Sequence, residues 1–316
     1  MRLKNTIKVI FASFATTYKL LLYKLIVLAV LATVGYFVIV PNFKYLIIDS
    51  HIKDLVISGA DVVTSIFTGV PSVAEARVPF TTALQGFKEY IAGDLSGIIW
   101  LLVVLMLLFV VGGFFNNLAN YATGEVVDDH MSSLSHKGFV VSIFKNLGKS
   151  SIFSLIEVGV SFLSFAIGTA FFLLIYITLF DVIGVVAVFF GIIIYIFCFA
   201  IKNSFLSDFM PEIIAGSSIK KAFKESLKLK STTFVSVLSN YVTIGLFVMY
   251  MNVSFAICTF FAGLIVTLPL STIIITSFKM VNYYTNRGKK FFISHDEIIT
   301  PKVAKEDLEL IKNLDD

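Results

Sequence analysis

The sequence predicts an all-α polytopic membrane bundle of six transmembrane helices with amphipathic interfacial helices. Hydrophobic residues make up 57% of the chain and charged residues only 15%, whereas soluble domains are about half apolar and about a quarter charged. The mean hydropathy is +0.91. Crossing about 30 Å of hydrocarbon takes roughly 20 apolar residues, and runs of about that length recur between segments that carry the lysines.

The predicted spans end where polar or helix-breaking residues interrupt the apolar runs. Pro41 is expected to stop the first span. The polar segment after Phe115 reads as a connection. Asp181 is expected to mark a tight turn between the third and fourth spans, and Asn252 with Ser254 another between the fifth and sixth. The six spans cover about residues 20–40, 97–115, 157–180, 182–201, 234–250 and 255–277.

The lysines and arginines predict the orientation of these spans. All but four of the 25 basic residues lie in the N-terminus, the second loop, the fourth loop or the tail. Cytoplasmic loops carry an excess of Lys and Arg, so both termini are predicted to be cytosolic. Lysine far outnumbers arginine, which suggests an AT-rich bacterial genome. We therefore expect a multi-pass protein of the bacterial cytoplasmic (inner) membrane.

Two segments lie outside the predicted spans. Residues 41–96 form an extracytosolic loop, whose short apolar groups predict one or two amphipathic helices on the outer face. Gly69, Pro71 and Pro79 are expected to break these helices. Residues 1–278 then form a single membrane domain, and residues 279–316 form a cytosolic tail with a short helix at about 303–314.

A basic amphipathic segment precedes the first, third and fifth spans. Apolar residues recur every four positions in each, as on one face of a helix. The pattern predicts a repeat of three hairpins. Alternatively, any basic lead-in to a membrane span has this form. The three stripes are Leu3/Ile7/Phe11, Phe139/Ile143/Leu147 and Ile219/Phe223/Leu227.

The third of these segments is the most basic. Lys220, Lys221, Lys224 and Lys228 surround its apolar stripe, so the helix is expected to lie on an anionic membrane surface. These lysines are candidate contacts for lipid head groups, at about 1 kcal/mol each near the surface. They could equally be orientation determinants without a ligand. Membrane lipids, and a membrane protein or a second copy of the chain, are the expected partners.

Two motifs resemble a known family. Residues 210–234, MPEIIAGSSIKKAFKESLKLKSTTF, contain Pro211 followed by an Ala-x-x-x-Ser helix with Ala222 and Ser226. The end of the sixth span, FKMVNYYTNRG, closes with Tyr283, Tyr284 and Arg287. Both resemble elements of bacterial six-helix membrane proteins, including the membrane domain of glycerophosphoryl diester phosphodiesterases. The tail after Ser277 is too short for a catalytic barrel, so the resemblance implies the membrane fold without the activity.

Glu157 is the carboxylate that lies deepest within an apolar run, and an ionisable group at membrane depth is a functional hypothesis by default. It shares a helical face with Ser154, Ser161 and Ser164. Asn240 and Thr243, beside Ser236 on the fifth span, are its expected partners. The alternative places Glu157 near the cytosolic interface, within reach of Lys149 or water.

Other residue patterns predict little chemistry. Nothing in the sequence has metal-ligand spacing or a known catalytic motif, so no metal, cofactor, nucleic acid or enzymatic activity is expected. Pro269 predicts a kink in the sixth span, as a packing feature or a gate. Five acidic and histidine residues after the second span could hold a divalent cation, but a solvated loop is the favoured interpretation. They are Glu125, Asp128, Asp129, His130 and His136. Cys198 and Cys258 lie in apolar runs and read as small core residues.

Two functions are favoured for this architecture, and an intramembrane enzyme is a third and less favoured class. The first is a non-enzymatic integral membrane protein that acts as a scaffold or accessory subunit in envelope or lipid-related processes. The second is a transporter of a small solute or lipid along a polar path between the third and fifth spans. A transporter needs a polar cavity that reaches mid-membrane, whereas a scaffold is packed shut there.

Overall fold

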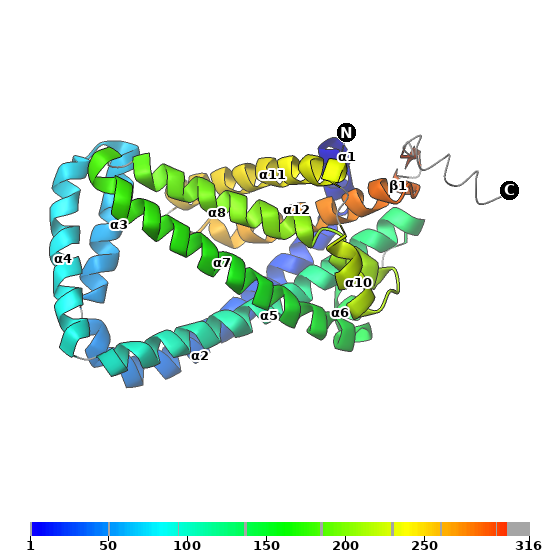
Figure 1. The fold of residues 1–316 in the computed structure, drawn as a ribbon. Coiled ribbons are helices and arrows are strands. Elements are labelled where there is room, and N and C mark those ends of the chain that lie inside the picture. The colour runs from blue at the N-terminus through cyan, green and yellow to red at the C-terminus, as the bar shows by residue number, and fades with distance from the viewer. Residues whose placement is uncertain are drawn as a thin grey trace. The chain divides into compact units, whose positions relative to one another are not determined.

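The computed structural model describes residues 2–49, 51–93, 95–135, 138–183, 186–228, 231–259, 261–294 and 296–301. Helices dominate this part of the chain (Figure 1). Six helical segments within it are long and apolar enough to cross a membrane. The chain therefore has the predicted fold, an all-α polytopic membrane bundle. The predicted helix at about 303–314 lies outside the described residues.

The elements follow one another in a simple order. The helices are α1 (Arg2–Ala12), α2 (Phe14–Asp49), α3 (Ile52–Thr68), α4 (Val73–Gly93), α5 (Leu95–Ser133), α6 (Phe139–Lys145), α7 (Leu147–Ile183), α8 (Val186–Phe205), α9 (Phe209–Ile214), α10 (Ile219–Ser226), α11 (Ser231–Cys258) and α12 (Leu264–Asn286); the strands are β1 (Phe291–Ser294) and β2 (Glu297–Ile299).

The chain forms two compact units, of which the smaller comprises residues 27–112. Within it, α3 and α4 form an antiparallel pair (Figure 1). Phe43 of α2 and Ile98 and Leu101 of α5 form its buried core, and Phe87 of α4 packs against them. The predicted loop 41–96 thus contains two helices, α3 and α4, in agreement with the one or two helices expected there.

The connection between α3 and α4 follows the predicted turn chemistry. Gly69 ends α3 in the left-handed conformation, at φ 73°, which glycine adopts without steric penalty. Ser72 and Glu75 then form a capping box at the start of α4: the Glu75 amide donates to Ser72 Oγ at 3.3 Å, and the Ser72 hydroxyl and amide donate to Glu75 Oε2 at 2.8 and 3.0 Å. The two hydrogen bonds from Ser72 to the carboxylate lower the pKa of Glu75.

The larger unit comprises residues 1–26 and 113–316. In it α7 packs along α8, α8 along α11, and α11 along α12 (Figure 1). Its main core contains many residues that lie outside the predicted spans, in segments predicted to be polar connections or tail. Val127 and Met131 of α5, Phe209 of α9, and Met280 and Val281 of α12 are nearly or fully buried there. Farther along the spans, large apolar side chains such as Leu163 and Leu246 are exposed, as lipid-facing residues are.

Several helices continue past their predicted ends. The polar segment after Phe115 is helical as far as Ser133, because its Ala119, Ala122 and Val126 are buried in a second core. The helix α7 runs through Asp181 to Ile183, and α11 runs through Asn252 and Ser254 to Cys258. The predicted turns at these positions are wrong: a single polar residue does not end a helix whose backbone hydrogen bonds are already made.

The predicted breaks at two prolines are also wrong. Pro41 lies inside α2 and Pro79 inside α4. Proline removes one backbone hydrogen bond from a helix, the one to the carbonyl four residues earlier. The other backbone hydrogen bonds of the helix remain. Side chains beside each proline add contacts within the helix: Asn42 Nδ2 donates to the Val38 carbonyl at 2.8 Å, and the Thr82 hydroxyl donates to the Val78 carbonyl at 3.1 Å.

Short helices α1, α6 and α10 precede α2, α7 and α11, as the three-hairpin pattern predicts. In α1, Ile7 and Phe11 of the predicted stripe are exposed, and Val9 and Ile10 are buried against the protein, so the structure leaves the membrane contact of this stripe as a prediction. In α6 and α10, the first two stripe residues pack against the protein core. The third residue of each stripe, Leu147 or Leu227, is exposed.

A two-stranded antiparallel hairpin, which is absent from the predicted elements, follows α12. Phe291 pairs with Ile299 and Phe292 with Ile298. Phe291 and Ile293 are buried in the main core. The run FFISHDEII, two short apolar groups around a polar pair, is the signal that predicts such a hairpin.

The predicted orientation can be tested with two cysteine variants in a Cys198→Ser, Cys258→Ser background. Ala60 is exposed on α3, and Ser218 precedes α10 without making a capping hydrogen bond. A membrane-impermeant maleimide added to intact cells should label Ala60→Cys. It should label Ser218→Cys only after permeabilisation. The reverse pattern would contradict cytosolic termini.

Candidate functional site

Glu157 lies in a buried group of charges that joins three helices. Lys202 Nζ of α8 donates to Glu157 Oε1 of α7 at 3.1 Å and to Ser161 Oγ at 3.0 Å. Lys279 Nζ of α12 lies 3.7 Å from the same carboxylate oxygen. The side chains of Glu157 and Lys279 are 6% and 7% exposed, and that of Lys202 is 15% exposed. We call Glu157, Lys202 and Lys279 the ion cluster.

The sequence of α7 places Glu157 on the face that packs against α8. Ser161 and Ser164 lie on this face, and the Ser164 hydroxyl donates to the Cys198 carbonyl at 3.3 Å. A Cβ at Gly168 would meet the Tyr195 ring at 3.0 Å, so the absence of a side chain lets the two helices approach. Small residues and interhelical hydrogen bonds are the usual means of helix association in membranes.

The ion cluster carries two positive charges and one negative charge. Glu157 Oε1 is shared by the two ammonium groups, and no hydrogen-bond partner of Oε2 is found among the described residues. Charged groups of low exposure are stable only when they are paired. The arrangement therefore suits a fixed electrostatic link between helices better than a free carboxylate that takes up protons or metal ions.

The predicted partners of Glu157 lie elsewhere. Asn240 donates to the Ser236 carbonyl and Thr243 to the Ser239 carbonyl, both within α11. The residues of α11 that face the bundle are Val237, Tyr241 and Ile244. Lys149, the other predicted partner, forms no salt bridge with Glu157 and is exposed. Lys202 and Lys279 were missed as partners, although both directly follow apolar runs and so lie at span ends.

A second polar chain links α1, α12, the α8–α9 corner and α11. Arg2 Nη1 donates to Asn282 Oδ1 at 2.7 Å, and Asn282 Nδ2 donates to Ser207 Oγ at 2.9 Å. The Ser207 hydroxyl lies 3.2 Å from the Tyr241 hydroxyl. Burial lowers the pKa of Arg2, and the charge of Asp208 opposes this effect. These contacts anchor the N-terminal helix to the last span.

The motif residues behind the family resemblance converge on the main core. Ala222 is fully buried there, and Tyr283 and Tyr284 contribute to the same cluster. The Tyr284 hydroxyl donates to Asp128 Oδ1 at 2.8 Å. Arg287 forms an ion pair with the nearly buried Glu212. Pro211 and Ser226 are also buried. The motifs thus have structural roles in this chain.

The loose acidic and histidine group is partly buried and helical, so its prediction as a solvated loop is wrong. His130 Nε2 lies 3.0 Å from the Ile293 carbonyl, and Asn146 donates to Glu125. Ser135 donates to Asp129. His136 lies outside the described residues. Within the described chain, no group of three or more His, Cys, Asp and Glu residues could hold a metal ion.

Pro269 lies inside α12, which continues to Asn286. Two hydroxyls donate to carbonyls beside it, Ser271 to Thr267 at 2.7 Å and Thr272 to Leu268 at 3.1 Å. Lys24 Nζ in turn donates to the Thr272 hydroxyl. These contacts fit a packing role for the proline.

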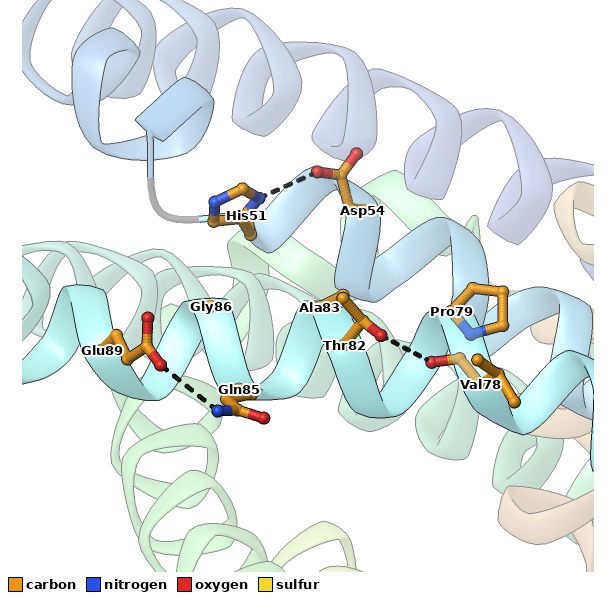
Figure 2. A pocket seen from close by; sticks show the side chains of 9 residues that line it. All are labelled: His51, Asp54, Val78, Pro79, Thr82, Ala83, Gln85, Gly86 and Glu89. Atoms are coloured by element: carbon orange, nitrogen blue, oxygen red, sulfur yellow. Dashed lines mark hydrogen bonds and ion pairs between the residues drawn. The ribbon is translucent and has the colours of Figure 1, made fainter.

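The smaller unit carries an open groove of about 540 Å³ between α3 and α4 (Figure 2). His51 Nδ1 lies 3.2 Å from Asp54 Oδ2, and Gln85 donates to Glu89 at 3.3 Å. A Cβ at Gly86 would lie 2.9 Å from His51 Cδ2, so glycine leaves room for the ring. The side chains of His51 and Asp54 are more than half exposed. The groove is therefore a shallow surface feature between two packed helices.

The fold and the ion cluster define a multi-pass integral membrane protein in which three spans share a buried electrostatic link. Comparisons of the chain with protein-family models, with curated proteins and with solved structures find no match. The function must therefore be inferred from the geometry.

Removing the Glu157 carboxylate should strongly destabilise the bundle. Glu157→Gln leaves Lys202 and Lys279 without their shared counter-charge, and breaking a buried pair in this way costs about 3–5 kcal/mol. Unfolding by SDS in mixed micelles would measure the free energy of unfolding.

Glu225→Gln is the matched control, because it removes a carboxylate that pairs with the exposed Lys228. A surface pair contributes at most about 1 kcal/mol. Glu157→Gln/Lys279→Met should recover part of the lost stability, since it also removes one unpaired charge. Equal stability of Glu157→Gln and Glu225→Gln would contradict the structural role of the ion cluster.

Proposed function

We propose that this chain is a non-enzymatic integral membrane protein that acts as a scaffold or accessory subunit in envelope or lipid-related processes of a bacterial inner membrane. The observation that carries the proposal is the separation of the polar residues of the third and fifth spans. A transport path between these spans would need Glu157, Ser161, Asn240 and Thr243 to face one another.

The contacts of these residues favour a closed bundle. Ser161 hydrogen-bonds Lys202 at 3.0 Å, inside the ion cluster. Asn240 and Thr243 bond to carbonyls of their own helix and are partly or fully exposed. Tyr241, between them in sequence, is fully buried against Phe278, with ring centroids 4.9 Å apart. The bundle-facing side of α11 thus offers an apolar wall to any solute near the ion cluster.

The large exposed apolar surface of the spans supports the scaffold role. Side chains such as Leu163 on α7 and Ile193 on α8 are exposed and can contact lipid or the helix of a partner. The lipid-related part of the proposal rests on the resemblance of the Pro211 and Tyr283/Tyr284/Arg287 motifs to the membrane domain of glycerophosphoryl diester phosphodiesterases. The catalytic activity of that family is not proposed for this chain.

Cysteine accessibility tests the closed bundle against the transporter. In the Cys198→Ser, Cys258→Ser background, Ser161→Cys and Asn240→Cys should resist a charged methanethiosulfonate reagent applied to either side of the membrane. The first thiol is enclosed by the ion cluster and the second faces lipid. Ser218→Cys serves as the reactive control. Rapid modification of both Ser161→Cys and Asn240→Cys would contradict the proposal and favour a hydrated path.

In-cell photo-crosslinking tests the scaffold role itself. A photoreactive amino acid replaces one exposed apolar residue on each span, and the adducts are identified by mass spectrometry. A scaffold should give discrete protein adducts from the spans of one face only. Lipid adducts alone at all six positions would count against a scaffold. The positions are Leu22, Leu102, Leu163, Ile193, Leu246 and Ile265.

A further inference from the structure

The helix α10 presents an exposed basic face. Lys220, Lys221 and Lys224 are exposed, and none of them forms a salt bridge with another described residue. Because an α-helix turns by about 100° per residue, the three side chains lie within an arc of about 100°. Lys228, just beyond the helix, pairs instead with Glu225 at 2.7 Å. We call Lys220, Lys221 and Lys224 the α10 lysine face.

The opposite side of α10 is occupied by the protein itself. Ala222 is fully buried, and Ile219 and Phe223 pack against the main core. The Phe223 ring meets the Phe209 ring edge to face, with centroids 5.4 Å apart. This corrects the expectation that the apolar stripe lies in the membrane surface. Leu227, at the C-terminal boundary of the helix, is the exposed member of the stripe.

The α10 lysine face lies close in the chain to the start of a membrane span. The helix α11 begins at Ser231, and its apolar window begins at Phe234. The helix α10 packs against α9, and Glu212 of α9 forms an ion pair with Arg287, which directly follows the sixth span. The lysines are therefore expected at the level where lipid head groups begin, because the fifth span starts and the sixth span ends near α10.

We propose that the α10 lysine face binds the phosphate-bearing head groups of anionic membrane lipids, and that it does so by charge alone. Three neighbouring ammonium groups that form no salt bridge with a described residue complement clustered lipid phosphates. The helix cannot insert its apolar face, because the main core already covers that face. Anchoring by the fold also holds the lysines in position before lipid arrives. The inference goes beyond the proposed scaffold role and does not depend on it.

The magnitude of the effect follows from the number of charges. Each lysine near an anionic surface strengthens binding about fivefold, so three strengthen it about 100-fold. The attraction is screened within about 10 Å at 0.1 M salt, and binding should therefore weaken steeply as salt is added.

The experiment uses the full chain in an uncharged detergent and titrates it with phosphatidylglycerol or phosphatidylcholine. Native mass spectrometry measures the bound lipid. The wild type should prefer phosphatidylglycerol, and Lys220→Gln/Lys221→Gln/Lys224→Gln should lose affinity for it by about 100-fold. The matched control removes three exposed lysines from the smaller unit, Lys44→Gln/Lys53→Gln/Lys88→Gln, and should retain the affinity. Equal melting temperatures of the two variants would show that both are folded.

Three results would overturn the inference. One is retention of phosphatidylglycerol affinity by the α10 variant. Another is an equal loss in both triple variants, which would assign the effect to total charge and not to this face. The third is a comparable loss on Leu227→Ala, with binding that persists at high salt, because this would show apolar insertion.

Discussion

One carboxylate between two ammonium groups links α7, α8 and α12 of this protein. Glu157 Oε1 lies 3.1 Å from Lys202 Nζ and 3.7 Å from Lys279 Nζ. Separating any of the three helices would leave a charge with no counter-charge in an apolar environment, which is costly in a membrane. Lipid tails give no hydrophobic drive for helices to associate. The relative positions of these spans therefore depend on such polar contacts and on close approaches such as that of Gly168 to Tyr195.

The rest of the larger unit is built around the same end of the spans. The polar chain from Arg2 through Asn282 to Ser207 ties α1 to α12. The main core also includes residues of α5, α9, α10 and β1 from segments that the hydropathy pattern assigns to connections and tail. This core makes the short helices part of the protein body. As a consequence, the apolar side of α10 is covered by the protein, and its lysines Lys220, Lys221 and Lys224 are exposed.

The two kinds of basic residue in this protein thus have different roles. Lys202 and Lys279 are paired with Glu157 at low exposure and hold helices together. Lys220, Lys221 and Lys224 are exposed, without salt bridges to described residues, and remain available to an anionic surface.

The sequence by itself determined the class of the protein, because hydropathy is a sum over neighbouring residues. Six apolar runs predict six membrane-spanning helices, and Gly69 and Pro71 predict the break between α3 and α4 from local turn chemistry alone. The face of α7 that carries Glu157 and Ser161 also follows from helical periodicity.

Only the tertiary structure decided which groups meet. The partners of Glu157 come from helices 45 and more residues away in the chain, and no local pattern distinguishes Lys202 and Lys279 from lysines such as Lys149 that stay at the surface. The same limit explains why Ile219 and Phe223 of α10 pack against the main core and not against the membrane surface. Whether a distant segment buries such residues cannot be read from their neighbours in the sequence.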